Sequence, residues 1–143
     1  MTREQELVVG EHIRQLATSV CSSLKCPWSS IVFTVAYRQG KTSARFTDVF
    51  YIKTDEEDDY VNAYSEEGHA LIHMGNLRKI ADAYRNLYEV CKRFGSQWAQ
   101  YTIHIDRRGH FESFFDFPQQ FKGSDPFDRK NMERWEMRFL YSE

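Results

Sequence analysis

The sequence predicts an α+β fold, in which one domain over residues 1–143 packs an antiparallel sheet of about four strands with two main helices and a short C-terminal helix. Two long segments carry apolar residues at the three- and four-residue spacing of amphipathic helices, and a shorter one follows near the end. Between them lie two pairs of segments rich in β-branched and aromatic residues, each joined by a short connection. One antiparallel sheet covered on one face by helices is the simplest architecture for this order.

Composition narrows the class of protein. With 143 residues, 41% of them hydrophobic and 15% aromatic, the chain can bury a core and is too apolar to be disordered. A formal net charge of −2 argues against a general nucleic-acid binder. The first residues are polar and no uncharged apolar run could span a bilayer, so we expect a cytoplasmic protein. The odd number of cysteines, three, favours reduced thiols over a disulfide or zinc site.

The first predicted helix starts near Thr2, which can form a capping box with Gln5. Its apolar stripe consists of Val9, Ile13, Leu16, Ala17, Val20 and Leu24. Pro27 ends the helix, because the residue before a proline disfavours the α conformation. Residues 30–37 and 44–53 then read as two strands, with a hairpin connection at residues 39–41.

An acidic run, residues 54–59, follows these strands, and such runs favour exposed loops because they repel themselves. After a polar connection, a second helical stripe consists of Leu77, Ile80, Ala81, Tyr84, Leu87, Tyr88, Cys91 and Phe94. Gly95 is well placed to end this helix in the left-handed conformation. The helix begins either at Asn76 as N-cap or earlier, with Gly75 inside it.

The second hairpin is predicted over residues 101–117, where apolar and polar residues alternate on both sides of Gly109. A three-residue loop with Gly109 left-handed pairs His104 with Glu112 and Ile105 with Phe111, whereas a two-residue loop would mix the two faces. Residues 118–125 read as a loop. Residues 128–141 read as a final helix whose apolar residues are Met132, Trp135, Phe139 and Leu140.

The polar face of this hairpin is the sharpest enzymatic candidate. His104, Asp106, His110 and Glu112 would gather there, and two histidines with two carboxylates can hold a metal or act as general acid and base. A solvent-facing sheet surface is also expected to be polar, however, and no recognised metal spacing is present. We favour the structural interpretation, and expect no catalytic residues, no metal and no cofactor. His69 and His73, four residues apart, would share a face if that stretch were helical, and we interpret them as a surface pair.

The remaining candidate is an acidic surface edged by tyrosine, which is enriched at interface hot spots. A negative patch can steer association with a basic partner and block a surface built to bind phosphate. The predicted partner-binding residues are Asp55, Glu56, Glu57, Asp58, Asp59 and Tyr60, extended by Glu66 and Glu67.

In residues 98–117 a tryptophan leads a strand, a glycine turn follows, and an aromatic, acidic strand completes the hairpin. Residues 128–140 form an arginine-rich tail with a tryptophan. These two stretches resemble the YezG-like immunity proteins, an antitoxin family of bacterial polymorphic and contact-dependent toxin systems. The predicted order of elements is similar over nearly the whole chain, with the first half matching least.

The resemblance implies an immunity protein that neutralises a cognate toxin domain, often a nuclease, by binding it tightly. It implies no active site, no direct contact with nucleic acid and no membrane association. Two other classes stay open on the sequence: a small enzyme using the histidine and carboxylate face, and an adaptor or chaperone for a secreted effector. The adaptor would engage an unfolded or N-terminal segment of its client.

Overall fold

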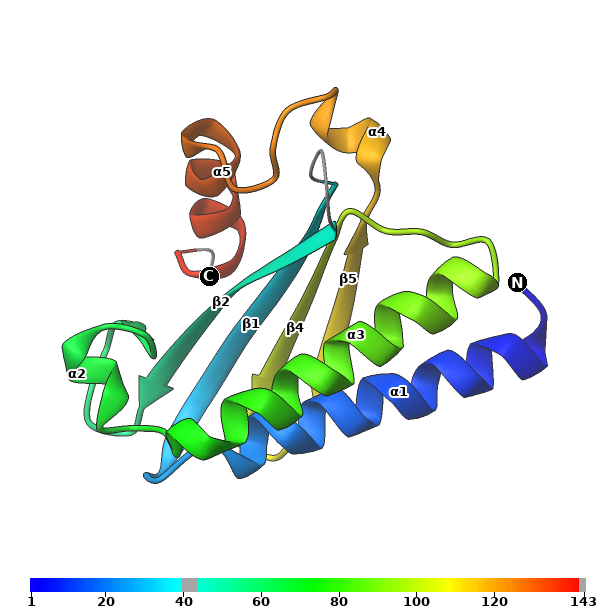
Figure 1. The fold of residues 1–143 in the computed structure, drawn as a ribbon. Coiled ribbons are helices and arrows are strands. Elements are labelled where there is room, and N and C mark those ends of the chain that lie inside the picture. Colours follow the sequence, from blue (N-terminus) through cyan, green and yellow to red (C-terminus); the bar gives the residue numbers. More distant parts are fainter. Residues whose placement is uncertain (40–43, 142–143) are drawn as a thin grey trace.

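The computed structural model describes residues 1–39 and 44–141. Within these ranges one antiparallel sheet has five strands in the order β3-β2-β1-β4-β5 (Figure 1). The strands are β1 (Trp28–Gln39), β2 (Ala44–Thr54), β3 (Val61–Asn62), β4 (Gln100–Asp106) and β5 (Phe111–Asp116). The α+β class and the four long strands agree with the prediction, and the two-residue β3 adds a short edge strand beside β2.

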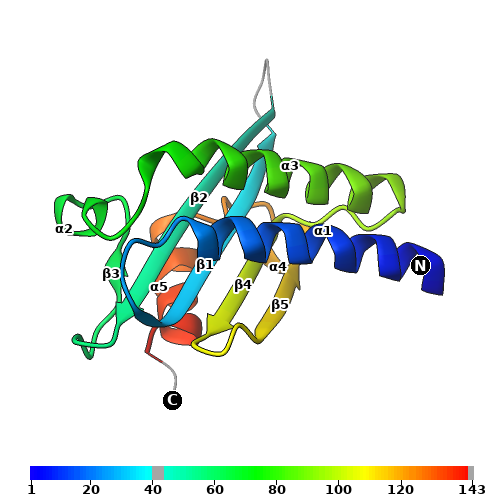
Figure 2. The same cartoon turned by 90° about the horizontal axis from the view of Figure 1, so that it is seen from below.

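One face of the sheet carries the two long helices, α1 (Arg3–Ser22) and α3 (Leu77–Arg93), which lie side by side across it (Figure 1, Figure 2). The predicted capping box of Thr2 and Gln5 is present at the start of α1. At the end of α3, Gly95 has φ of +80°, the left-handed conformation predicted for it. The apolar stripes of both helices pack on Ile31, Phe33 and Val35 of β1, in one continuous core.

The opposite face is covered as well, so the prediction of a single covered face is wrong. Helix α5 (Arg129–Phe139) lies on it, with the side chain of Trp135 only 4% exposed (Figure 2). The central strand β1 therefore buries alternate residues on both faces: Val32, Thr34 and Ala36 are as inaccessible as the helix-facing residues between them. An unbroken apolar run is typical of a strand covered on both sides.

The second hairpin follows the predicted register. His104 pairs with Glu112 and Ile105 with Phe111. The amide of Asp106 donates to the carbonyl of His110 at 2.9 Å, and Gly109 has φ of +83°. These pairs and this hydrogen bond confirm the three-residue loop. The physical reason is that only this register keeps the apolar side chains on one face of the sheet and the polar ones on the other.

Several local predictions differ from the structure. Asn76 occupies the N-cap position of α3, one of the two predicted starts, but its side chain does not cap the helix. A 3₁₀ turn, η1 (Met74–Asn76), contains Gly75 and precedes α3, and the Asn76 amide donates to the Ser22 carbonyl instead. The predicted loop after β5 contains a helical turn, α4 (Pro118–Phe121), and the polar connection before α3 contains α2 (Glu66–His69). Of the hairpin connection predicted at residues 39–41, positions 40 and 41 lie outside the described residues.

Candidate partner-binding surface

The acidic run forms the connection between β2 and β3, and we call residues 55–59 the acidic turn. All five of its side chains are exposed, and a hydrogen bond of 3.4 Å from the Glu57 amide to the Thr54 carbonyl closes its first part. Asp55 forms an ion pair with Arg107, which belongs to the loop between β4 and β5. Glu56, Glu57, Asp58 and Asp59 form no ion pair within the described chain, so their charge faces solvent uncompensated.

Glu66 and Glu67 lie beyond β3, in the first turn of α2, where the negative charge of a carboxylate interacts favourably with the helix dipole. Both are exposed, and the Ser65 hydroxyl caps the helix by accepting from the Gly68 amide at 3.0 Å. Gly68 itself is buried so tightly against β3 that a Cβ there would lie 2.0 Å from the Asn62 carbonyl oxygen. The two glutamates are therefore held at the far end of β3 from the acidic turn.

Tyr60 is half-buried and is held by two contacts with the sheet. Its hydroxyl lies 2.6 Å from the Ser30 Oγ, and that oxygen lies 2.8 Å from Nε2 of His104. The ammonium of Lys53 lies 4.7 Å from the centre of the Tyr60 ring, within the range of a cation–π interaction. The acidic turn and the hairpin face, which the sequence presents as two separate candidates, thus meet through Ser30 at one end of the sheet.

The four polar residues of the hairpin face have separate roles. Asp106 shapes the turn, since its carboxylate accepts from the amides of Arg108 at 2.9 Å and His110 at 3.0 Å. Slight desolvation raises the pKa of Asp106, but these amides and the nearby His110 ring outweigh it and leave the pKa below its usual value. His104 is bonded to Ser30, and Glu112 is exposed. Across the described residues, no three histidine, cysteine or acidic side chains are grouped so as to hold a metal.

The other candidate side chains lie apart. His69 ends α2 and His73 follows in extended conformation, so they share no helix face. All three cysteines are free; Cys91 is buried, while Cys21 and Cys26 are half-buried. Burial raises the pKa of each thiol, and the charge of Asp55 raises that of Cys26 further. A raised pKa disfavours the reactive thiolate.

The sequence did not predict a half-buried carboxylate on β2. Asp48 lies on the helix-facing side of β2 between Phe46 and Phe50, and it accepts hydrogen bonds from the hydroxyls of Tyr64 and Tyr84. Burial raises the pKa of Asp48 in spite of these two bonds. An aspartate at an apolar position of an alternating strand is the signal that could have identified it.

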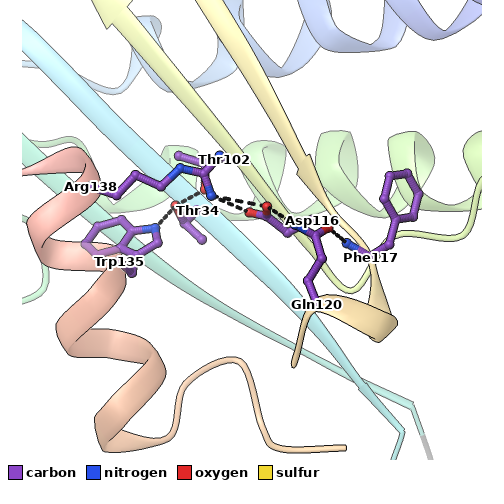
Figure 3. A network of polar contacts seen from close by, with 7 residues as sticks. All are labelled: Thr34, Thr102, Asp116, Phe117, Gln120, Trp135 and Arg138. Carbon is purple, nitrogen blue, oxygen red and sulfur yellow. Dashed lines mark hydrogen bonds and ion pairs between the residues drawn. The ribbon is translucent and has the colours of Figure 1, made fainter. Parts of the chain in front are cut away.

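The polar contacts beneath α5 were also missed. Figure 3 shows the Trp135 indole donating to the Thr34 hydroxyl at 2.8 Å, and that oxygen lies 2.7 Å from the Thr102 hydroxyl. Beside them, Arg138 contacts both carboxylate oxygens of Asp116 at 3.1 and 3.2 Å (Figure 3). Buried polar groups need such partners, so this network fixes where α5 docks on the sheet.

In comparisons of the sequence with protein-family models and with curated proteins, none matches. Among the helices within the described ranges, none combines the length and the apolar character needed to cross a bilayer. What the fold and the site define is a small α+β domain with an uncompensated acidic turn at one end of its sheet.

Proposed function

We propose that this protein is an immunity protein: a cytoplasmic, non-catalytic inhibitor that binds a cognate bacterial toxin domain and covers its active or substrate-binding surface. In this proposal the toxin is a nuclease, whose phosphate-binding surface is basic. The observation that supports it most is the acidic turn, where four adjacent carboxylates face solvent without a cation from the described chain. Uncompensated surface charge attracts and orients an oppositely charged partner.

The geometry around Tyr60 supports a preformed interface. The hydroxyl of Tyr60 is tied to Ser30, and Asp55 is tied to Arg107, so both ends of the acidic turn are attached to the sheet. A segment that is ordered before binding loses less conformational entropy on association, and this favours tight binding. The Tyr60 ring, held in place, is suited to act as an aromatic anchor.

The first experiment isolates the tagged protein from its native cell and identifies what copurifies. We expect one partner in a 1:1 complex that carries a toxic domain, and we expect the purified protein to abolish the activity of that domain at equimolar concentration. A partner bound through an unfolded segment, or a toxin that stays active in the complex, would refute inhibition. Absence of any stoichiometric partner at low salt would refute it as well.

The second experiment tests the surface with the variant Glu56→Lys/Glu57→Lys/Asp58→Lys. The control variant, Glu6→Lys/Asp82→Lys/Glu89→Lys, makes the same change in net charge at exposed positions of α1 and α3. We expect the first to slow association by about 10- to 100-fold at low ionic strength and to leave folding unaltered. The difference between the variants should shrink near 1 M salt, where the screening length is about 3 Å. Equal rates for both variants would place the interface elsewhere.

The hairpin face can contribute to the same interface. If His104 or His110 contacts the partner, replacing either with alanine weakens binding. The dissociation constants of the two variants test the contribution. Unchanged constants in both variants would limit the interface to the acidic turn.

A further inference from the structure

A cavity of about 160 Å³ lies between α5, α4 and the adjoining ends of β4 and β5. Its walls combine aromatic rings, among them Trp135 and Phe139, with polar groups of Gln100, Asp116, Arg134 and Arg138. It is separate from the acidic turn: Gln100 begins β4, whereas Arg107, the partner of Asp55, follows the last residue of that strand. At about 3.3 Å per residue, the two sites are roughly 20 Å apart.

Gln100 lines this cavity without a hydrogen-bond partner for its side chain among the described residues. The residue as a whole is 3% exposed. Its neighbours on the same face are bonded, as Thr102 is to Thr34 and Asp116 to Arg138. An amide that lines a cavity without a protein partner is available to hydrogen-bond a molecule inside it.

The charge of the lining points to the kind of molecule. Arg134 and Arg138 contribute +2 and Asp116 contributes −1, which leaves +1 in total. Asp116 is occupied by Arg138 and by the Gln120 amide at 3.3 Å, whereas Arg134 forms no ion pair within the described part of the chain. Lys130 and Arg138, one turn away on either side, add to the positive potential around Arg134. The occupant should carry one negative charge.

We propose that this cavity binds a small carboxylate with a short hydrocarbon chain. The carboxylate lies between the Arg134 guanidinium and the Gln100 amide, both hydrogen-bond donors, and the chain lies against the rings of Trp135 and Phe139. Planar guanidinium groups pair well with carboxylates. A volume of 160 Å³ corresponds to about five water molecules in the liquid, which suits a ligand of about six non-hydrogen atoms.

Butyrate is the probe, followed by the NMR signals of the Trp135 indole N–H and the Gln100 side-chain amide. We expect both signals to shift saturably with a dissociation constant on the order of 1 mM, the range for so small a ligand. Butyramide and butylammonium have nearly the same size but no negative charge, and neither should shift them. No saturable shift with butyrate, or equal shifts with all three compounds, would overturn the proposal and leave a cavity that holds water alone.

Two variants separate a built site from general electrostatic attraction. Arg134→Gln removes the lining cation that forms no ion pair with a described residue, and we expect it to weaken butyrate binding about tenfold or more. Lys130→Gln removes the same charge one turn away on α5, outside the lining, and we expect a change of less than about twofold. Equal losses in both variants would overturn the site. Neither result bears on toxin binding, which the acidic-turn variants test separately.

Discussion

Replacing Trp135 with phenylalanine removes a single donor from the network beneath α5. The ring of Trp135 lies 5.5 Å from that of Tyr51 and 5.7 Å from that of Phe139, between centroids, and phenylalanine keeps an aromatic ring in this position. What it loses is the N–H bonded to Thr34, a residue 101 positions earlier in the chain. The variant therefore tests the contact that joins α5 to the central strand.

The expected cost has two parts. Loss of a buried hydrogen bond destabilises by about 1–1.5 kcal/mol, since the Thr34 hydroxyl retains Thr102 as a partner. The smaller ring adds about 1 kcal/mol by leaving a void. The free energy of unfolding should thus fall by about 2–2.5 kcal/mol, and the melting temperature by roughly 6–10 °C for a chain of this size.

Trp98→Phe is the matched control. Trp98 is 1% exposed, but among the described residues its Nε1 finds no conventional acceptor and interacts weakly with the Cys91 thiol. Its replacement should therefore cost about 1 kcal/mol, the size contribution alone. Urea unfolding of both variants measures the difference, and a double-mutant cycle of Trp135→Phe with Thr34→Val should give a coupling of about 1 kcal/mol. If Trp135→Phe costs no more than Trp98→Phe, the Trp135 bond does not hold α5.

Three further predictions concern stability, each measured by chemical unfolding. Gly68→Ala should cost about 2–4 kcal/mol because its Cβ would collide with the Asn62 backbone, whereas Gly75→Ala, with open space around it, should change stability by less than about 0.5 kcal/mol. Gly10→Ala in α1 should stabilise by about 0.5–1 kcal/mol, since its Cβ meets Arg14 only at 3.8 Å; a loss would refute this. The raised pKa of Asp48 means that its protonated form favours the fold: this contribution is complete below the ordinary value of 3.8 and is lost as the pH rises through the higher folded value. Wild type should therefore lose stability relative to Asp48→Asn as the pH rises above the ordinary value of 3.8, and parallel pH profiles would contradict the assignment.

The sequence predicted correctly those features of the backbone that depend on residues close to one another in the chain. The capping box at Thr2 and the left-handed Gly95 and Gly109 appear as expected, and alternation alone selects the register of the second hairpin. In each case the interaction joins residues close in sequence, so the pattern contains the information needed.

The parts that the sequence did not predict depend on distant contacts. Residues 31–36 are buried on both faces of β1 and all but Thr34 are apolar, and such a run does not indicate what covers the second face. The second face is covered by α5, which is joined to β1 by the hydrogen bond of Trp135 to Thr34, about a hundred residues apart in the chain. The short α2 is stabilised by the close approach of Gly68 to β3, which no periodicity of so few residues could indicate.

The same reasoning applies to the candidate site, whose two parts are brought together by strand pairing. Ser30 in β1 pairs with Lys53 on one side and with Asp106 on the other, so it lies between the ends of β2 and β4. With neighbouring strands about 4.8 Å apart, the backbones of β2 and β4 are roughly 10 Å apart, and the ion pair of Asp55 with Arg107 joins the acidic turn to the hairpin loop. A standard interface buries about 800 Å² on each partner and would extend over both. The salt dependence from the acidic turn and the loss of affinity in His104→Ala should therefore occur in the same complex, and a partner that shows only one of them contacts only that side of Ser30.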